Sequence, residues 1–242
     1  MRGELCESAA QRQEETPLKT EMIDNWKGFI KRLPSLFLGL FLFALGVVMN
    51  LYSNLGMSPW GVFQVGLAER LPMTFGQVSQ FVGLVVLAIG WGLGFPPGFS
   101  TFANMYFIGF FIDLIMAWGL LSQPTNIIWQ LVMLIAGVAT IGIASLFYLR
   151  VQLGAGPRDG LMVGLVTKLD RPVSYVRIAI EGTVLVLGYA LGGPVGLGTI
   201  ITTLLTGPTV QAAFKLGGFD AKSEQVNLYK LTRCLSGKDT LP

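Results

Sequence analysis

Histidine is absent from this 242-residue sequence. Its absence excludes Ser-His and Cys-His nucleophilic sites, histidine metal ligands and the usual proton shuttle near neutral pH. Cysteine is almost as scarce, because the chain has only Cys6 and Cys234, which lie near its two ends without a CxxC spacing. We therefore expect no disulfide framework and no thiolate metal site, and we expect both thiols to be free in a reducing compartment.

Charged side chains are also scarce. They make up 13% of the chain, about half of their share in an ordinary soluble domain, whereas 52% of the residues are apolar. Residues 33–149 contain three charged side chains and residues 182–214 contain none. This distribution is typical of a membrane protein with polar ends and argues against a soluble enzyme. The basic residues form no stripe with interleaved aromatics, so we expect no nucleic-acid partner.

Six apolar stretches are long enough to cross about 30 Å of hydrocarbon as helices. They lie at residues 33–52, 76–94, 101–121, 127–149, 174–192 and 199–216. The sequence thus predicts an all-α, multi-spanning helical membrane protein. We expect a polar tail with an interfacial end at 1–32, one membrane repeat at 33–121, a second at 127–216 and a polar tail at 217–242.

Basic residues indicate the orientation of these spans. They precede the first span, separate the fourth from the fifth and follow the sixth, whereas the links at 95–100, 122–126 and 193–198 contain none. The positive-inside rule then places both termini in the cytoplasm. The first 32 residues show no pattern of a cleaved signal peptide.

Two further apolar segments, residues 58–71 and 156–170, are too short for a full crossing at 1.5 Å per residue. Each begins with a small residue followed by proline, Ser58-Pro59 and Gly156-Pro157, which is typical of a helix start because the first helical N–H needs no partner within the helix. We interpret both segments as half-helices that are re-entrant or interfacial. An arrangement in which both cross the membrane also leaves both termini inside, so it stays open.

The sequence contains an internal repeat with an offset of 98 residues. Between residues 55 and 109, 17 of 55 positions are identical to their counterparts, including Pro59 with Pro157 and Pro96 with Pro194. A constant offset with matched prolines indicates duplication. Three spans and one half-helix per copy would place the copies in opposite orientations, so the sequence predicts two inverted repeats. Paired interrupted segments in such repeats are typical of alternating-access transporters.

The positions at which the two copies differ are the candidate functional residues. A charge at the centre of a bilayer costs at least about 2.5 kcal/mol, so it should face a cavity or a partner. Arg177 and Glu181 can pair on one helix face, since they are four residues apart. Arg177 fits snorkelling to headgroups as well, and Asp113 also fits a hydrogen-bonded structural role. The candidate set is Trp60, Asn104, Asp113, Arg158, Asp159, Arg177 and Glu181.

Four stretches carry a resemblance to a known family. They read LGMSPWGVFQVGL, GFSTFANMYFIGFFIDLI, LGAGPRDGLMVGL and VRIAIEGTVLVLGYALGGPVGLGTIITTLLTGP. Over residues 33–216 the chain resembles the YczE/YitT-type bacterial integral membrane proteins, in particular the YczE-like branch. The resemblance implies a multi-spanning protein of the bacterial cytoplasmic (inner) membrane and a transport role, but no catalytic residues.

The sequence therefore predicts a small secondary transporter for an organic anion or zwitterion, with no enzyme activity, cofactor or bound metal. Arg158, Arg177 and the two half-helix starts would hold a carboxylate, sulfonate or phosphate. Asp113, Asp159 or Glu181 would bind an amine or carry a coupling proton, and Asn104 and Trp60 would line the pocket. The alternatives are a non-transporting scaffold or regulatory subunit, a substrate-binding component of a larger uptake complex, and an intramembrane hydrolase. The lipid bilayer and a small solute are the expected partners, and nothing in the sequence indicates an oligomeric state.

Overall fold

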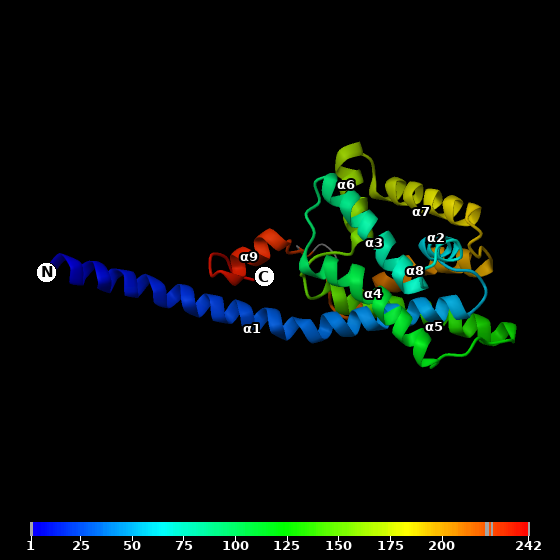
Figure 1. The fold of residues 1–242 in the computed structure, drawn as a ribbon, viewed down its shortest axis with the longest axis horizontal. Helices are drawn as coiled ribbons and strands as arrows, with labels where there is room; N and C mark the ends of the chain where they lie inside the picture. Colours follow the sequence, from blue (N-terminus) through cyan, green and yellow to red (C-terminus); the bar gives the residue numbers. More distant parts are fainter. Residues whose placement is uncertain (1, 221–222, 224, 242) are drawn as a thin grey trace.

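The computed structural model describes residues 2–220, 223 and 225–241, and their side chains from residue 22 onward, so the Cys6 thiol lies outside the described part. The described residues form helices without a strand (Figure 1). The helices are α1 (Arg2–Tyr52), α2 (Pro59–Ala68), α3 (Phe75–Gly92), α4 (Phe99–Trp118), α5 (Ile127–Leu149), α6 (Pro157–Leu169), α7 (Val173–Ala190), α8 (Leu197–Leu216) and α9 (Leu228–Leu235).

Six of these helices are long and apolar enough to cross a membrane. Five are α3, α4, α5, α7 and α8, and the sixth is the part of α1 from Met22 to Tyr52. The chain is therefore a multi-pass helical membrane protein, as the sequence predicts. The first span begins before residue 33 because the aromatic and basic stretch before it is helical as well. There Phe29 is buried and its ring meets that of Phe99 at 5.2 Å.

Helices α2 and α6 are the two predicted half-helices. Pro59 and Pro157 occupy the first helical positions, after the N-cap residues Ser58 and Gly156. The Ser58 hydroxyl accepts a hydrogen bond from the Gly61 amide at 3.4 Å. At 1.5 Å per residue, the two helices are about 15 and 20 Å long, which is about half and about two thirds of the hydrocarbon thickness.

Helices α1 and α5 cross at the centre of the bundle through closely packed glycines. A Cβ atom on Gly39 would lie 2.7 Å from the Tyr148 amide nitrogen, and one on Gly137 would lie 2.4 Å from the Asn50 side-chain oxygen. Gly39 and Gly137 are 98 residues apart, and so are Asn50 and Tyr148. Each contact thus has its counterpart at the offset of the sequence repeat, and small residues allow the close approach.

The links between helices repeat the same relation. The Leu55 carbonyl accepts a hydrogen bond from the Gly198 amide at 2.6 Å, and the Leu153 carbonyl accepts one from the Ser100 amide at 2.8 Å. Leu55 and Leu153 are 98 residues apart, and so are Ser100 and Gly198, so the two hydrogen bonds join equivalent positions of the repeat. The start of each half-helix loop is therefore hydrogen-bonded to the start of a span in the other half.

One helix pair does not follow this relation. Helix α3 packs along α4, whereas α7, its counterpart, packs on α2 and α6 and has no comparable contact with α8. Figure 1 shows α7 at the outer edge of the bundle. Helix α7 buries only Val176 and Gly188. The bundle is thus closed between α3 and α4 and open between α7 and α8.

The segment after α8, predicted only as a polar tail, folds against the ends of the spans. The buried Asn25 side chain donates hydrogen bonds to the Cys234 carbonyl at 2.7 Å and the Asp239 carbonyl at 2.8 Å, and accepts one from the Leu241 amide at 3.0 Å. Val226 is fully buried, and its amide donates to the Gln152 carbonyl at 2.9 Å. The Cys234 thiol is free and buried, as expected of a reduced cysteine.

Candidate functional site

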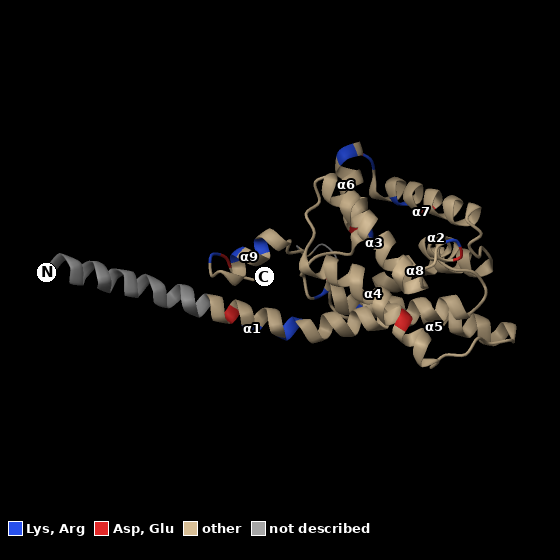
Figure 2. Ribbon diagram, viewed as in Figure 1, with Lys and Arg blue, Asp and Glu red and all other residues tan. Residues whose placement is uncertain are grey.

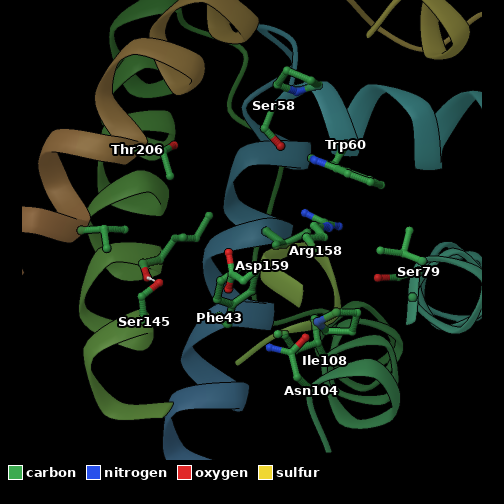
Figure 3. A pocket seen from close by; sticks show the side chains of 18 of the residues that line it. Phe43, Ser58, Trp60, Ser79, Asn104, Ile108, Ser145, Arg158, Asp159 and Thr206 are labelled. Carbon is green, nitrogen blue, oxygen red and sulfur yellow. Dashed lines mark hydrogen bonds between the residues drawn. The ribbon is translucent and has the colours of Figure 1, made fainter. Parts of the chain in front are cut away.

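A cavity of about 370 Å³ lies at the centre of the bundle, lined by residues from all eight helices α1 to α8 and the loops before α2 and α6. Figure 3 shows Arg158 and Asp159 projecting among Trp60, Asn104 and Ser145. Charged residues are otherwise rare along the helices (Figure 2). The polar residues that line the cavity are Asn50, Ser58, Gln64, Ser79, Asn104, Ser145, Tyr148, Arg158, Asp159, Arg177, Glu181, Thr202, Thr203, Thr206 and Gln211.

The two half-helices begin at this cavity and place Trp60 against Arg158. The Arg158 guanidinium carbon lies 4.7 Å from the centre of the Trp60 ring, which is a cation–π contact. Trp60 and Arg158 occupy the same position in the two halves, since they are 98 residues apart. The contact therefore joins equivalent positions of the sequence repeat at the wall of the cavity.

Asp159 lies beside Arg158 and is held by helix α5. The Tyr148 hydroxyl donates a hydrogen bond to one Asp159 carboxylate oxygen at 3.3 Å. A Cβ atom built on Gly156 would lie 3.5 Å from that same oxygen and 3.6 Å from the Asn104 amide nitrogen. The carboxylate, the phenol and the amide thus gather around the start of α6, each at ordinary contact distance from the Cβ position of Gly156.

Arg177 and Glu181 form the ion pair that their spacing predicts. The distance from the Arg177 Nε to the Glu181 Oε1 is 2.9 Å. Both residues project from α7 into the cavity lining, and the Arg177 side chain is 51% exposed against 25% for Glu181. The pair thus lies on the open side of the cavity, where Arg177 reaches toward solvent or headgroups and Glu181 lies deeper.

The cavity lining contains two basic and two acidic side chains, and these four do not form two ion pairs. Asp159 accepts a hydrogen bond from Tyr148, and Arg177 is paired with Glu181. Among the residues that the structure describes, no carboxylate oxygen lies within 4.0 Å of an Arg158 nitrogen. Arg158 therefore retains free donor directions for an incoming anion. The described residues also include no group of three or more acidic or cysteine side chains that could hold a metal ion.

Asp113 is the one predicted site residue that does not line the cavity. Its carboxylate accepts hydrogen bonds from the Thr74 hydroxyl and, at 2.9 Å, from the Gly76 amide. These donors lie at the start of α3, so Asp113 on α4 caps the first turn of its neighbour. The other six residues, Trp60, Asn104, Arg158, Asp159, Arg177 and Glu181, are all brought together.

Several residues that line the cavity are not among the site residues that the sequence predicts. Tyr148 and Ser145 were missed because neutral polar residues at the end of an apolar span carry no insertion penalty comparable to that of a charge. A signal was nonetheless present. The 98-residue offset pairs Tyr148 with Asn50, so both copies have a hydrogen-bonding side chain at this depth, and the fold places both at the cavity.

Comparison with known proteins identifies the family. A family model covers residues 30–215; it is DUF6198, a family of unknown function. The chain is 33% identical over 194 residues to the "Uncharacterized membrane protein YczE" of Bacillus subtilis, covering 78% of this chain and 85% of that protein. It is 31% identical over 186 residues to an uncharacterized protein of Haemophilus influenzae, covering 77% and 84%. No solved structure matches the chain. The chain thus belongs to the DUF6198 family, with YczE-like relatives, as its sequence resemblance predicts.

Proposed function

We propose that this protein is a small secondary transporter that moves an organic anion or zwitterion across the bacterial cytoplasmic membrane, without enzyme activity or a cofactor. The observation that carries the proposal is the difference between two equivalent helix pairs around one charged cavity. Helices α3 and α4 are closed on one side of the cavity, and α7 and α8 are open on the other. An exchange of these two arrangements would expose the cavity to each side of the membrane in turn.

Two inverted repeats are part of this proposal. They are supported by the recurrence of contacts at an offset of 98 residues, both at the crossing of α1 and α5 and at the starts of the spans. A structure made of two such repeats can adopt two states of similar energy, because each half can take the conformation of the other. The closed pair α3 and α4 then serves as a template for the closed form of α7 and α8.

In the proposed binding mode, Arg158 provides the cation for the anionic group of the solute. The amides in the first turns of α2 and α6 add partial positive charge at the same place, and the Gly61 amide among them already donates to the Ser58 hydroxyl. Arg177 would complete the anion site from α7. Asp159 or Glu181 would bind an amine or a coupling proton, and Asn104 and Trp60 would fix the orientation of the solute.

The proposed switch is a movement of α7 toward α8. Helix α8 contains Gly207 and Pro208 in its interior, and Pro208 removes one helical hydrogen bond. A Cβ atom on Gly207 would meet nothing within 4 Å, whereas one on its counterpart Gly109 would lie 2.3 Å from the Gly76 carbonyl. The empty space at Gly207 is thus where α7 would pack in the closed form.

The orientation follows the positive-inside rule. A short link joins the end of α7 at Ala190 to the start of α8 at Leu197, so the open pair can separate most where α7 begins and α8 ends. These ends lie next in sequence to the basic residues Lys168, Arg171 and Lys215. We infer that both termini are cytoplasmic and that the cavity opens to the cytoplasm in this structure. The closed ends of α3 and α4 would then face the periplasmic or external side.

Binding measurements on the purified chain in nanodiscs test the proposal. The probes are small carboxylates, sulfonates, phosphates and amino acids, scored by isothermal titration calorimetry. We expect at least one probe class to bind, and Arg158→Ala and Arg177→Ala to weaken its affinity about tenfold or more, since a charge-assisted hydrogen bond contributes about 1.5–3 kcal/mol. Glu181→Ala should weaken the zwitterions selectively.

The matched controls are Arg171→Ala and Glu69→Ala, because neither residue lines the cavity. Unchanged affinity in both Arg177→Ala and Glu181→Ala would count heavily against the proposed site. Binding without uptake into proteoliposomes would instead favour a substrate-binding component of a larger uptake complex.

A further inference from the structure

A second cavity, which we call the apolar groove, lies between α2, α3, α6 and α7. Its volume is about 460 Å³. The side chains that line it are apolar except Thr183, whose hydroxyl donates to the Ala179 carbonyl at 2.8 Å, and Trp60, which has one indole N–H. Phe81 and Ile89 border it and are 46% and 49% exposed on the lipid-facing surface of α3. The groove therefore offers a ligand a mainly apolar lining. It opens between α3 and α7, which are both long and apolar enough to span a membrane, so we expect it to face the acyl region of the bilayer.

The apolar groove lies next to the charged cavity and shares a wall with it. Trp60, Val82, Val86 and Ile180 line both of them. At this wall Trp60 borders the groove and also stacks on the Arg158 guanidinium at 4.7 Å. The Trp60 side chain thus separates the Arg158 guanidinium, which has donors free for a ligand, from the apolar groove. A molecule with an anionic head and a single apolar tail would match both environments at once.

The two halves contribute to the groove in equivalent pairs. Phe63 corresponds to Leu161, Leu67 to Leu165, and Val82 to Ile180, each at the 98-residue offset. If the two halves exchange conformations, α2 and α6 change places with each other, and so do α3 and α7. The same four helices then still line the groove. The groove would therefore persist in both states of the proposed transporter, while the access side of the charged cavity changes.

We infer that the solute is a single-chain anionic amphiphile, whose head occupies the charged cavity at Arg158 and whose tail lies in the apolar groove. This inference rests on the proposed function and specifies its substrate class. A persistent groove allows the tail to stay in the acyl region while the head is transferred between the two sides. The gap between α3 and α7 would admit the tail from the bilayer.

A homologous series of alkyl sulfonates, from ethanesulfonate to octanesulfonate, tests the inference on the full chain in nanodiscs, with empty nanodiscs subtracted. Each added methylene should strengthen binding about threefold to fourfold until the groove is filled, the gain expected for moving a CH₂ group out of water. Octanol should bind more weakly than octanesulfonate, because it lacks the anionic head. Arg158→Ala should weaken every sulfonate in the series.

Ala179→Trp is the diagnostic variant, because Ala179 lines the groove but not the charged cavity. It should abolish the gain with chain length and leave the affinity for ethanesulfonate unchanged. Ile178→Trp is the matched control, since Ile178 is 72% exposed and lines neither cavity. It should behave like the wild type.

The results separate the two proposals. Arg158-dependent binding of ethanesulfonate with no gain along the series would overturn the amphiphile and leave the anion site standing. The same conclusion holds if the gain survives in Ala179→Trp, or if octanol binds as tightly as octanesulfonate, since the groove would then hold ordinary bilayer lipid. Failure of every sulfonate to bind would overturn both the amphiphile and the sulfonate-binding role of Arg158.

Discussion

The pair α3 and α4 and the pair α7 and α8 are equivalent segments of the sequence repeat. They differ in packing, since α3 packs along α4 whereas α7 and α8 are separated. In the closed pair, Asp113 caps the start of α3 and Gly109 lies against Gly76. The corresponding positions of the open pair are Gln211, Gly207 and Ser174. The open pair α7 and α8 therefore lacks a carboxylate equivalent to that of Asp113, which joins α4 to the start of α3.

The two helix pairs thus differ both in how they pack and in the side chains that they contribute to the cavity. One pair has a strong latch and no charged residue in the cavity lining. The other has no such latch and provides Arg177 and Glu181. A transporter with one latched pair rests in a single preferred state, so solute binding must supply the free energy to change it.

The largest effect should come from disturbing the closed pair at its glycine contact. A side chain at residue 109 must collide with backbone, because a Cβ atom there would lie 2.3 Å from the Gly76 carbonyl. We expect Gly109→Leu to destabilise the protein by about 1–3 kcal/mol, measured by unfolding in mixed micelles.

Gly207→Leu is the matched control in the open pair, since nothing lies within 4 Å of its Cβ position. It should change stability by less than about 0.5 kcal/mol and yet block uptake, because it fills the space that α7 must enter. Equal destabilisation by both variants would remove the distinction between the pairs.

The next effect concerns the latch. Asp113→Ala removes the acceptor for Thr74 and Gly76, and loss of such a cap costs about 0.5–2 kcal/mol. We expect faster labelling of a cysteine placed at Ser79 from the side that α3 and α4 now close, because the closed pair would open more often. Gln211→Ala, at the equivalent position, should leave both stability and this labelling unchanged. A result in which Gln211→Ala acts like Asp113→Ala would contradict the latch.

The smallest effect compares the two ends of the molecule. The C-terminal segment covers the loops at Gly98 and Gly154, while among the described residues no such cover lies over the corresponding loops at Gly56 and Gly196. Asn25→Ala removes three hydrogen bonds to that segment and should release α9 locally while the spans remain folded, because each of these bonds contributes about 0.5–1.5 kcal/mol to the docking of the segment and none of them joins one span to another.

The Cys234 thiol reports this release. Burial raises the pKa of the thiol, so less thiolate is present at a given pH and alkylation is slow until the pH exceeds the raised pKa. Asn25→Ala should return the pKa toward its ordinary value. Alkylation should then accelerate most at pH values between the ordinary and the raised pKa, and an unchanged pH profile would contradict the contact.

The spans, the half-helices and the place of six of the seven candidate residues at the cavity follow from the sequence. An apolar run must be long enough to cross the hydrocarbon, proline is tolerated at the first position of a helix, and a charge in an apolar run is costly unless it faces a cavity or a partner. Helix α9 was not predicted, although Leu228, Leu231 and Leu235 recur at helical spacing after the N-cap Asn227. A helix of eight residues is marginal without tertiary packing, so this short pattern was included in the polar tail. Asp113 was predicted to line the cavity because comparison of the two sequence copies shows which residues differ. It does not show which helix pair is closed, because that depends on the conformation of the whole bundle.

The most direct test of the account is a distance measurement between spin labels on the two helix pairs in liposomes. In the closed pair, Gln80 and Tyr106 are joined by a hydrogen bond at 2.8 Å from the Gln80 amide to the Tyr106 carbonyl. Their counterparts at the 98-residue offset are Ile178 and Leu204, which are 72% and 67% exposed.

Labels at 178 and 204 should show two populations, a long distance and a short one similar to that between labels at 80 and 106. A bound solute should change their ratio, and the labels at 80 and 106 should respond in the opposite sense. A single long distance between 178 and 204 that no solute alters would contradict alternating access.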